Sequence, residues 1–216
     1  MQIFYKTLLC VSLTMLLAAC NDSDDKTTEQ QINPVSFNPV EASISDVHNS
    51  ILSHGASCVQ VVQSYLDRIN AYDKQGPTLN SIITINPNAL KDAQALDDYF
   101  KQSGKLKGTL HCVTVLPKDN IDTLDMPNTG GSVALANNIP ADDAFIIKRI
   151  REQGGIILGK ANLDEFAFGF GGKSSHPNAG QVKNVYDLAK GSGGSSAGTG
   201  VLISVSLALI GIGTDT

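Results

Sequence analysis

A glycine- and serine-rich segment that runs directly into an apolar one constrains this fold more than any other feature. Residues 191–198 read Gly-Ser-Gly-Gly-Ser-Ser-Ala-Gly, and residues 197–209 are apolar on nearly every side. The apolar stretch is too short to span a bilayer as a helix, so we expect a helix buried in the core. The preceding loop then presents free backbone N–H groups. A P-loop needs a terminal Gly-Lys-Ser/Thr, which is missing here, and a plain structural turn is the alternative.

Strands and helices alternate along the rest of the chain. Apolar periodicity predicts two helices between Val40 and Tyr72, with Ser57 as the N-cap of the second. Two further helices are expected, over residues 88–101 and from Asp142 or Asp143 to Gln153. Short β-branched or apolar runs predict strands over residues 79–85, 110–116, 156–158 and 210–213. This alternation predicts an α/β domain with a largely internal sheet.

Side-chain spacing also predicts which faces of these helices are buried. In the helix that ends at Gln153, the residues spaced for packing are Phe145, Ile146, Arg149 and Ile150. In the 88–101 helix, Asp97 and Asp98 are adjacent and therefore point to different azimuths. We expect them on a solvated face rather than in a paired-carboxylate site.

The first twenty residues are typical of an export signal. Lys6 precedes a short apolar stretch that ends in Leu17-Ala18-Ala19-Cys20. This ending resembles the bacterial lipobox, in which the cysteine, here Cys20, is lipidated and becomes the first mature residue. An ordinary cleaved signal peptide with an incidental cysteine is the alternative. Asn21 after the cysteine favours the outer over the inner membrane by resemblance to enterobacterial sorting.

We therefore divide the chain into a signal peptide over residues 1–19, a flexible tether over 20–39 and a folded region over 40–216. The tether is polar and has few apolar residues. The expected location is the bacterial cell envelope, with the protein facing the periplasm and touching the membrane only through its lipid.

Two cysteines remain once Cys10 in the signal and Cys20 at the lipid are set aside. They are Cys58 and Cys112, and the periplasm is oxidising. They form either a disulfide or two separately buried thiols, because a sequence does not supply the distance between their Cα atoms.

Charge and ligand spacing exclude several kinds of partner. The formal net charge is −5 and the chain has no basic run, which argues against nucleic acid. No group of histidine, cysteine or carboxylate residues has the spacing of metal ligands, so neither a metal nor an organic cofactor is predicted.

Four sequence blocks, in order, resemble the amidase signature family. The resemblance covers roughly residues 41–216, and four ordered blocks are far more specific than a single glycine motif. The blocks are Pro117-Lys118-Asp119-Asn120-Ile121-Asp122-Thr123, Gly130-Gly131-Ser132, Gly159-Lys160-Ala161-Asn162-Leu163-Asp164-Glu165-Phe166, and Gly193-Gly194-Ser195-Ser196-Ala197-Gly198 with Gly213-Thr214-Asp215.

The resemblance implies a mixed sheet core flanked by helices and a Ser–cis-Ser–Lys triad that hydrolyses amides. Lys118 matches the catalytic lysine and Ser195 matches the cis-serine. A lysine acts as a base only when uncharged, so Lys118 should be buried. The substrate would be a small-molecule amide or a peptide amide. The residues expected around the substrate and its oxyanion are Gly193, Gly194, Ser196, Asp215 and Thr216.

The remaining polar residues of these blocks receive structural interpretations. Lys160 follows a predicted strand, and the resemblance makes its block structural and pocket-forming. Asp119 and Asp215 are expected to accept backbone N–H bonds and hold loops. Asp164 and the glutamate after it are expected to cap a helix. His176 lies outside the blocks, in the loop before Ser195, and is expected to be a plain loop residue.

The sequence departs from the family at its C-terminal end. In the family the nucleophilic serine follows the cis-serine by about two dozen residues, which falls a few residues beyond Thr216. The same turn supplies most of the oxyanion hole, commonly the largest catalytic contribution. We therefore expect a truncated amidase that is inactive alone, with the fold incomplete at its C-terminus. The alternative is a non-catalytic lipoprotein that reuses the amidase half as a binding module.

Overall fold

The computed structural model describes residues 33–215, so the predicted signal peptide, the lipidation residue Cys20, most of the tether and Thr216 lie outside the described residues. The end of the predicted tether packs on the domain. Val35 N–H donates to Ser53 Oγ at 2.9 Å, and the Phe37 and Tyr65 ring centroids lie 6.0 Å apart. The folded region therefore begins before residue 40. Between residues 33 and 215, no helix has the length and apolar character needed to cross a membrane.

The helices occupy the segments that the apolar periodicity predicts, with shifted ends. They are α1 Ile44–Leu52, α2 Cys58–Ile69, α3 Ala89–Ser103, α4 Phe145–Glu152 and α5 Ala197–Ser204. A short π-helix, Asn70–Lys74, continues α2, and two 3₁₀ turns span Val133–Leu135 and Glu165–Ala167. The predicted helix over 197–209 is thus shorter than expected, and Ile203 on α5 is partly exposed.

The strands form three small sheets. They are β1 Ile82–Ile85, β2 Thr114–Pro117, β3 Ile156–Ile157, β4 Gly159–Ala161, β5 Lys183–Asn184, β6 Asp187–Gly191 and β7 Ile210–Ile212. The central sheet is parallel with the order β3-β2-β7, while β1 pairs with β4 and β5 with β6 in antiparallel fashion. This is the mixed α/β architecture that the resemblance implies. Strand β7 is half-buried.

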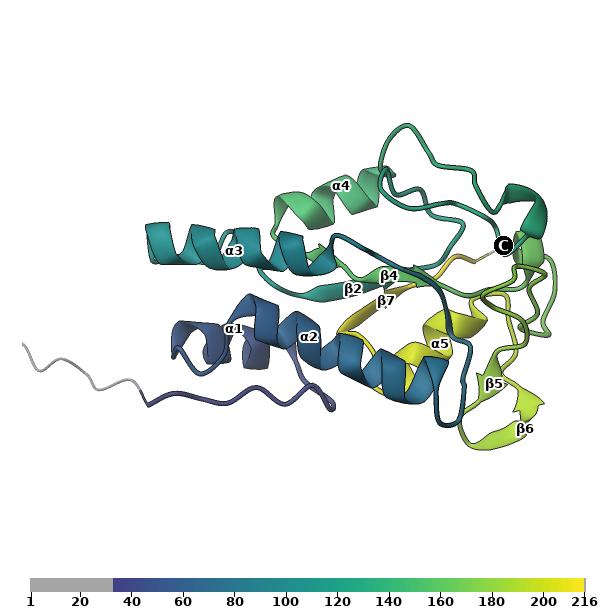
Figure 1. The fold of residues 1–216 in the computed structure, drawn as a ribbon, viewed down its shortest axis with the longest axis horizontal. Coiled ribbons are helices and arrows are strands. Elements are labelled where there is room, and N and C mark those ends of the chain that lie inside the picture. Colours follow the sequence, from purple (N-terminus) through teal and green to yellow (C-terminus); the bar gives the residue numbers. More distant parts are fainter. Residues whose placement is uncertain (1–32, 216) are drawn as a thin grey trace, which may run out of the picture. The chain divides into compact units, whose positions relative to one another are not determined.

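Strand β2 separates two apolar layers, because successive strand side chains point to opposite faces. Leu116 packs in the layer that contains α1, α2, α3 and part of α5. Val115 packs in the layer that contains Ile147 and Ile150 of α4. Figure 1 shows α4 on one side of β2 and β7, and α5 on the other. The sheet is therefore internal, as predicted.

The N-terminus of α2 is fixed by two polar contacts. Ser57 and Gln60 form a capping box, which confirms Ser57 as the N-cap. The carboxylate of Asp97 on α3 accepts from Cys58 N at 2.6 Å and from Val59 N at 3.0 Å. Asp97 is half-buried against the start of α2 rather than on a solvated face, because its partners come from a different helix, whereas Asp98 is exposed, as predicted.

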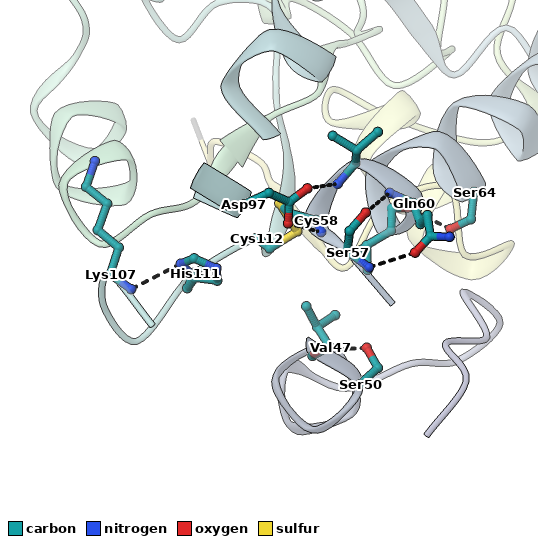
Figure 2. Close-up of a disulfide and its surroundings, with 12 residues drawn as sticks. Val47, Ser50, Ser57, Cys58, Gln60, Ser64, Asp97, Lys107, His111 and Cys112 are labelled. Carbon is teal, nitrogen blue, oxygen red and sulfur yellow. Dashed lines mark hydrogen bonds between the residues drawn. A yellow bond between two sulfur atoms is a disulfide. The ribbon is translucent and has the colours of Figure 1, made fainter. Parts of the chain in front are cut away.

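Cys58 and Cys112 form a disulfide between the start of α2 and the segment before β2 (Figure 2). Their Cα atoms lie 5.5 Å apart, and both residues are completely buried. Of the two alternatives that the sequence left open, the structure therefore contains the disulfide. The bond ties the helical layer to the segment that leads into β2, which Lys118 follows.

Three local predictions in the region of α4 and β4 were wrong. Phe145 and Ile146 are exposed, and α4 packs through Ile147 and Ile150 instead. Asp143 does not cap α4; its carboxylate accepts from Leu124 N and pairs with Arg151. Residues 159–161 form strand β4, so Lys160 lies within a strand rather than after one.

Candidate active site

Lys118 follows directly after β2 and is held by strands on both sides. Its N–H donates to Ile212 O of β7 at 2.8 Å, and the residue forms a parallel bridge with Ala161 of β4. The side chain is completely buried. Backbone pairing on both sides therefore fixes the point from which the amine projects.

The Lys118 amine is surrounded by hydroxyl groups. Nζ donates to Ser195 Oγ at 2.8 Å and to Thr214 Oγ1 at 2.7 Å. Burial lowers the pKa of Lys118 below its ordinary value of 10.5, while the charges of Asp164 and Asp215 partly oppose this shift. A lowered pKa makes the uncharged amine easier to form, and an uncharged amine can accept a proton from a neighbouring hydroxyl.

Ser195 lies in the glycine-rich turn between β6 and α5. The Gly194–Ser195 peptide bond is cis, as the resemblance implies. Ser195 O accepts from Asp164 N at 3.1 Å, and Gly198 N donates to Asn162 O at 2.9 Å. The block around Asn162 therefore supports the turn that presents Ser195.

Ser196 holds the end of β7 against the start of α5. Its Oγ donates to Thr214 O at 3.1 Å and accepts from Thr214 N at 3.2 Å. A Cβ atom on Gly213 would lie only 2.8 Å from Ser196 Oγ, so a glycine is needed there. Ser196 therefore positions Thr214, which in turn contacts Lys118.

A cavity of about 680 Å³ opens beside Ser195. It brings together all the predicted substrate-region residues that the structure describes, and exposed aromatic side chains of Phe168, Phe170 and Tyr186 border it. The predicted residues in its lining are Gly193, Gly194, Ser195, Ser196 and Asp215. Thr216 was also predicted here and lies outside the described residues.

Lys160 and Asp119 form a structural unit away from the cavity lining. Lys160 Nζ donates to Asp119 O at 3.1 Å and to Pro127 O at 3.2 Å, and it lies 3.9 Å from Asp119 Oδ1. Asp119 Oδ2 accepts from Thr129 N at 3.0 Å and from Gly131 N at 3.2 Å. The loop-holding interpretation of Asp119 is confirmed.

Two other sequence-based interpretations have different outcomes. Asp164 does not cap the turn that follows it; its Oδ1 accepts from Gly171 N and Lys173 N, each at 3.1 Å. That capping prediction was wrong. His176 accepts at Nδ1 from Asn178 N at 3.2 Å and is a loop residue, as expected.

Sequence reasoning missed Thr214 as a neighbour of Lys118. Thr214 belongs to the fourth motif block. Its contact with Lys118 depends on the parallel register that pairs Pro117 of β2 with Ile212 of β7. Among residues 33–215 there is also no group of three or more histidine, cysteine or carboxylate side chains arranged for a metal ion.

Comparison with known proteins agrees with this geometry. A family model described as Amidase matches residues 60–216. The chain is 35% identical over 179 residues to a subunit of the chloroplastic/mitochondrial glutamyl-tRNA(Gln) amidotransferase of Vitis vinifera, covering 82% of this chain and 32% of that protein. It is 38% identical over 186 residues to a probable amidase of Arabidopsis thaliana, covering 83% of this chain and 36% of that protein.

Solved structures give the same result. Native peptide amidase from Stenotrophomonas maltophilia superimposes with a TM-score of 0.73 at 36% identity, covering 78% of this chain and 35% of that one. The fold and site thus define an α/β protein of the amidase type. The chain belongs to the amidase family. It spans about a third of the length of the relatives it matches.

Proposed function

We propose that this chain forms the N-terminal part of an amidase that hydrolyses carboxylic amide C–N bonds. Lys118 is the general base, and Ser195 relays a proton to it. The observation that carries the proposal is the 2.8 Å contact between Lys118 Nζ and Ser195 Oγ. Three features support these roles: the amine is buried, its pKa is lowered, and Ser195 lines a cavity large enough for a small ligand.

The third catalytic group in this proposal is a serine supplied by polypeptide that follows Thr216. Its hydroxyl would give its proton to Ser195 while Ser195 gives its own to Lys118. The serine oxygen would then attack the amide carbon, and the proton held by Lys118 would return to the departing amine. Water would hydrolyse the resulting ester by the same relay. Without that serine and the N–H groups of its turn, residues 1–216 alone would not hydrolyse amides.

The proposed substrate is a small-molecule amide or a peptide amide. Support comes from the peptide amidases among the structural relatives, one of which was solved with the competitive inhibitor chymostatin. The aromatic side chains at the cavity border would contact apolar parts of such a substrate.

Reconstitution tests this proposal. Residues 33–216, which include the packed segment before residue 40, would be fused to the remaining C-terminal portion of the Stenotrophomonas maltophilia peptide amidase, and peptide amide hydrolysis measured. We expect hydrolysis by the fusion and none by the chain alone. Lys118→Ala should reduce the rate about 10²- to 10⁴-fold, the usual contribution of a general base. Lys190→Ala, which removes an exposed lysine of β6, is the matched control.

Three results would contradict the proposal. Hydrolysis by the chain alone, abolished by Lys118→Ala, would show that no further serine is needed. Equal rates for a folded fusion with and without Lys118 would show that Lys118 is not the base. A fusion that folds and binds chymostatin yet never hydrolyses an amide would favour a binding module.

We further propose that the protein is lipid-anchored through Cys20 and faces the periplasm, with the outer membrane as its location. The lipobox-like ending of the N-terminal segment supports this, and the Cys58–Cys112 disulfide agrees with an oxidising compartment. In a bacterial host, labelled fatty acid should enter the protein, and Cys20→Ser should abolish labelling and release it from membranes. Unchanged labelling of Cys20→Ser would contradict the anchor.

A further inference from the structure

Asp164 contacts two of the segments that line the cavity beside Ser195. Its main-chain N–H donates to Ser195 O at 3.1 Å. Its Oδ1 accepts from Gly171 N and Lys173 N, each at 3.1 Å, in the loop that carries the exposed Phe168 and Phe170. The residue is 4% exposed. One buried residue thus joins the serine turn to this neighbouring loop.

The second carboxylate oxygen of Asp164 lies against Gly194. A Cβ atom built on Gly194 would lie 1.7 Å from Asp164 Oδ2 and 2.9 Å from its Cγ. Gly194 is not among the glycines with positive φ, so its backbone does not require glycine. Contact with Asp164 therefore explains why residue 194 lacks a side chain.

This oxygen carries charge that nearby donors do not neutralise. Oδ2 is buried and has no hydrogen-bond partner among the described residues. An unpartnered buried carboxylate oxygen acts strongly on charges around it. The charge of Asp164 raises the pKa of Lys118 against the larger effect of burial, and Asp215 acts in the same direction. The lysine amine itself donates to the neutral hydroxyls of Ser195 and Thr214.

We propose that Asp164 is a positioning residue for the Lys118–Ser195 pair. Its main-chain N–H and its Oδ2 hold the Gly194–Ser195 turn in place. Its Oδ1 holds the loop of residues 169–173 next to that turn. The proposal rests on the proposed function, because the pair that Asp164 positions is the pair assigned as base and relay. It adds a residue whose charge and shape both act on that pair without touching substrate.

A double-mutant cycle tests the contact with Gly194. Gly194→Ala, Asp164→Ala and the double variant would be compared by the urea midpoint of unfolding. The new methyl group collides with the carboxylate of Asp164. Gly194→Ala should therefore lower the urea midpoint at least twice as much when Asp164 is present as when it is replaced by alanine. Equal losses in the two backgrounds would overturn the contact. If Gly194→Ala fails to fold while the double variant folds, the contact is supported.

A second measurement tests the charge and remains informative if the alanine variants do not fold. Asp164→Asn keeps an oxygen that accepts from Gly171 and Lys173 but removes the charge. NMR titration of isotopically labelled lysine side chains, with Lys118 assigned from Lys118→Met, should give a lower pKa for Lys118 in Asp164→Asn. Asp187→Asn, which changes an exposed carboxylate of β6, is the matched control.

The same pKa for Lys118 in Asp164→Asn and Asp187→Asn would overturn the proposal. Neither measurement requires catalytic turnover. A failure of the Asp164 proposal can therefore be told apart from a failure of the proposed function. Suppose that both measurements support the Asp164 contact, but Lys118→Ala leaves the hydrolysis rate of the reconstituted fusion unchanged. The proposed function would then be wrong, while the role of Asp164 in positioning the turn would be supported.

Discussion

Two lysines are buried between residues 33 and 215, Lys118 and Lys160, and they differ in what surrounds their amines. Neither is exposed, and burial lowers the pKa of both. Lys160 donates to the carbonyls of Asp119 and Pro127 and lies near the Asp119 carboxylate. Lys118 donates to the hydroxyls of Ser195 and Thr214.

This difference separates a structural lysine from one suited to proton transfer. Carbonyl and carboxylate oxygens only accept hydrogen bonds, so the partners of Lys160 need a permanent donor. Hydroxyl groups can donate as well as accept, so the partners of Lys118 remain satisfied when its amine is uncharged. Ser195 and Thr214 also line the cavity. Burial alone therefore does not identify a lysine that acts as a base. The kind of group that contacts its amine does.

The largest expected effect that sharpens this comparison is the loss of stability in Lys160→Met. Removing one member of a buried charge pair leaves Asp119 without its cation and two carbonyls without a donor. We expect the free energy of unfolding to fall by about 3–5 kcal/mol. Urea unfolding of the purified chain measures it.

Lys118→Met is the matched variant for that experiment. Its neighbouring hydroxyls can find other partners, so we expect a change within about 1 kcal/mol. If the two methionine variants lose the same stability, the distinction between the two lysines is wrong.

The pH dependence of stability gives a smaller effect. The pKa of Lys118 is lowered in the folded chain, so its contribution is fully present above 10.5 and is lost as pH falls through the folded pKa. In the window between the two pKa values, the stability of wild type relative to Lys118→Met should rise with pH by about 1.4 kcal/mol per unit. Unfolding curves at a series of pH values measure this slope. A difference that is flat with pH would mean that folding does not change the Lys118 pKa.

Thr214→Val should give the smallest effect. It removes one hydroxyl partner of Lys118, which should cost about 0.5–1.5 kcal/mol, the net contribution of one hydrogen bond. Thr199→Val, which removes only a long 3.4 Å contact with Ile212 O, is the control and should cost less. Urea midpoints measure the loss of stability in the two variants. An equal loss in both would mean that the Thr214 hydroxyl has no special role beside Lys118.

The sequence predicted the parts of this molecule that local pattern or ordered motifs determine. Ser57 was identified as an N-cap from its position, and Lys118 and Ser195 were paired through the motif blocks. Contacts between residues far apart in the sequence could not be predicted from it. Thr214 reaches Lys118 only through the register of β7 against β2.

Other misses have the same origin. Asp164 and Asp97 were interpreted from their own segments, while their partners lie in a separate loop and in another helix. In α4, the apolar Phe145 lies outside the core, so hydrophobicity alone gave the wrong helix face.

The most direct test of the central claim is the ionisation of the Lys118 amine in the folded chain. NMR titration of labelled lysine side chains, with the Lys118 signal assigned from Lys118→Met, gives its pKa. We predict a pKa below the ordinary 10.5, because the amine is buried among hydroxyls. A pKa at or above 10.5 would mean that Lys118 stays an ammonium ion, which contradicts its role as a base.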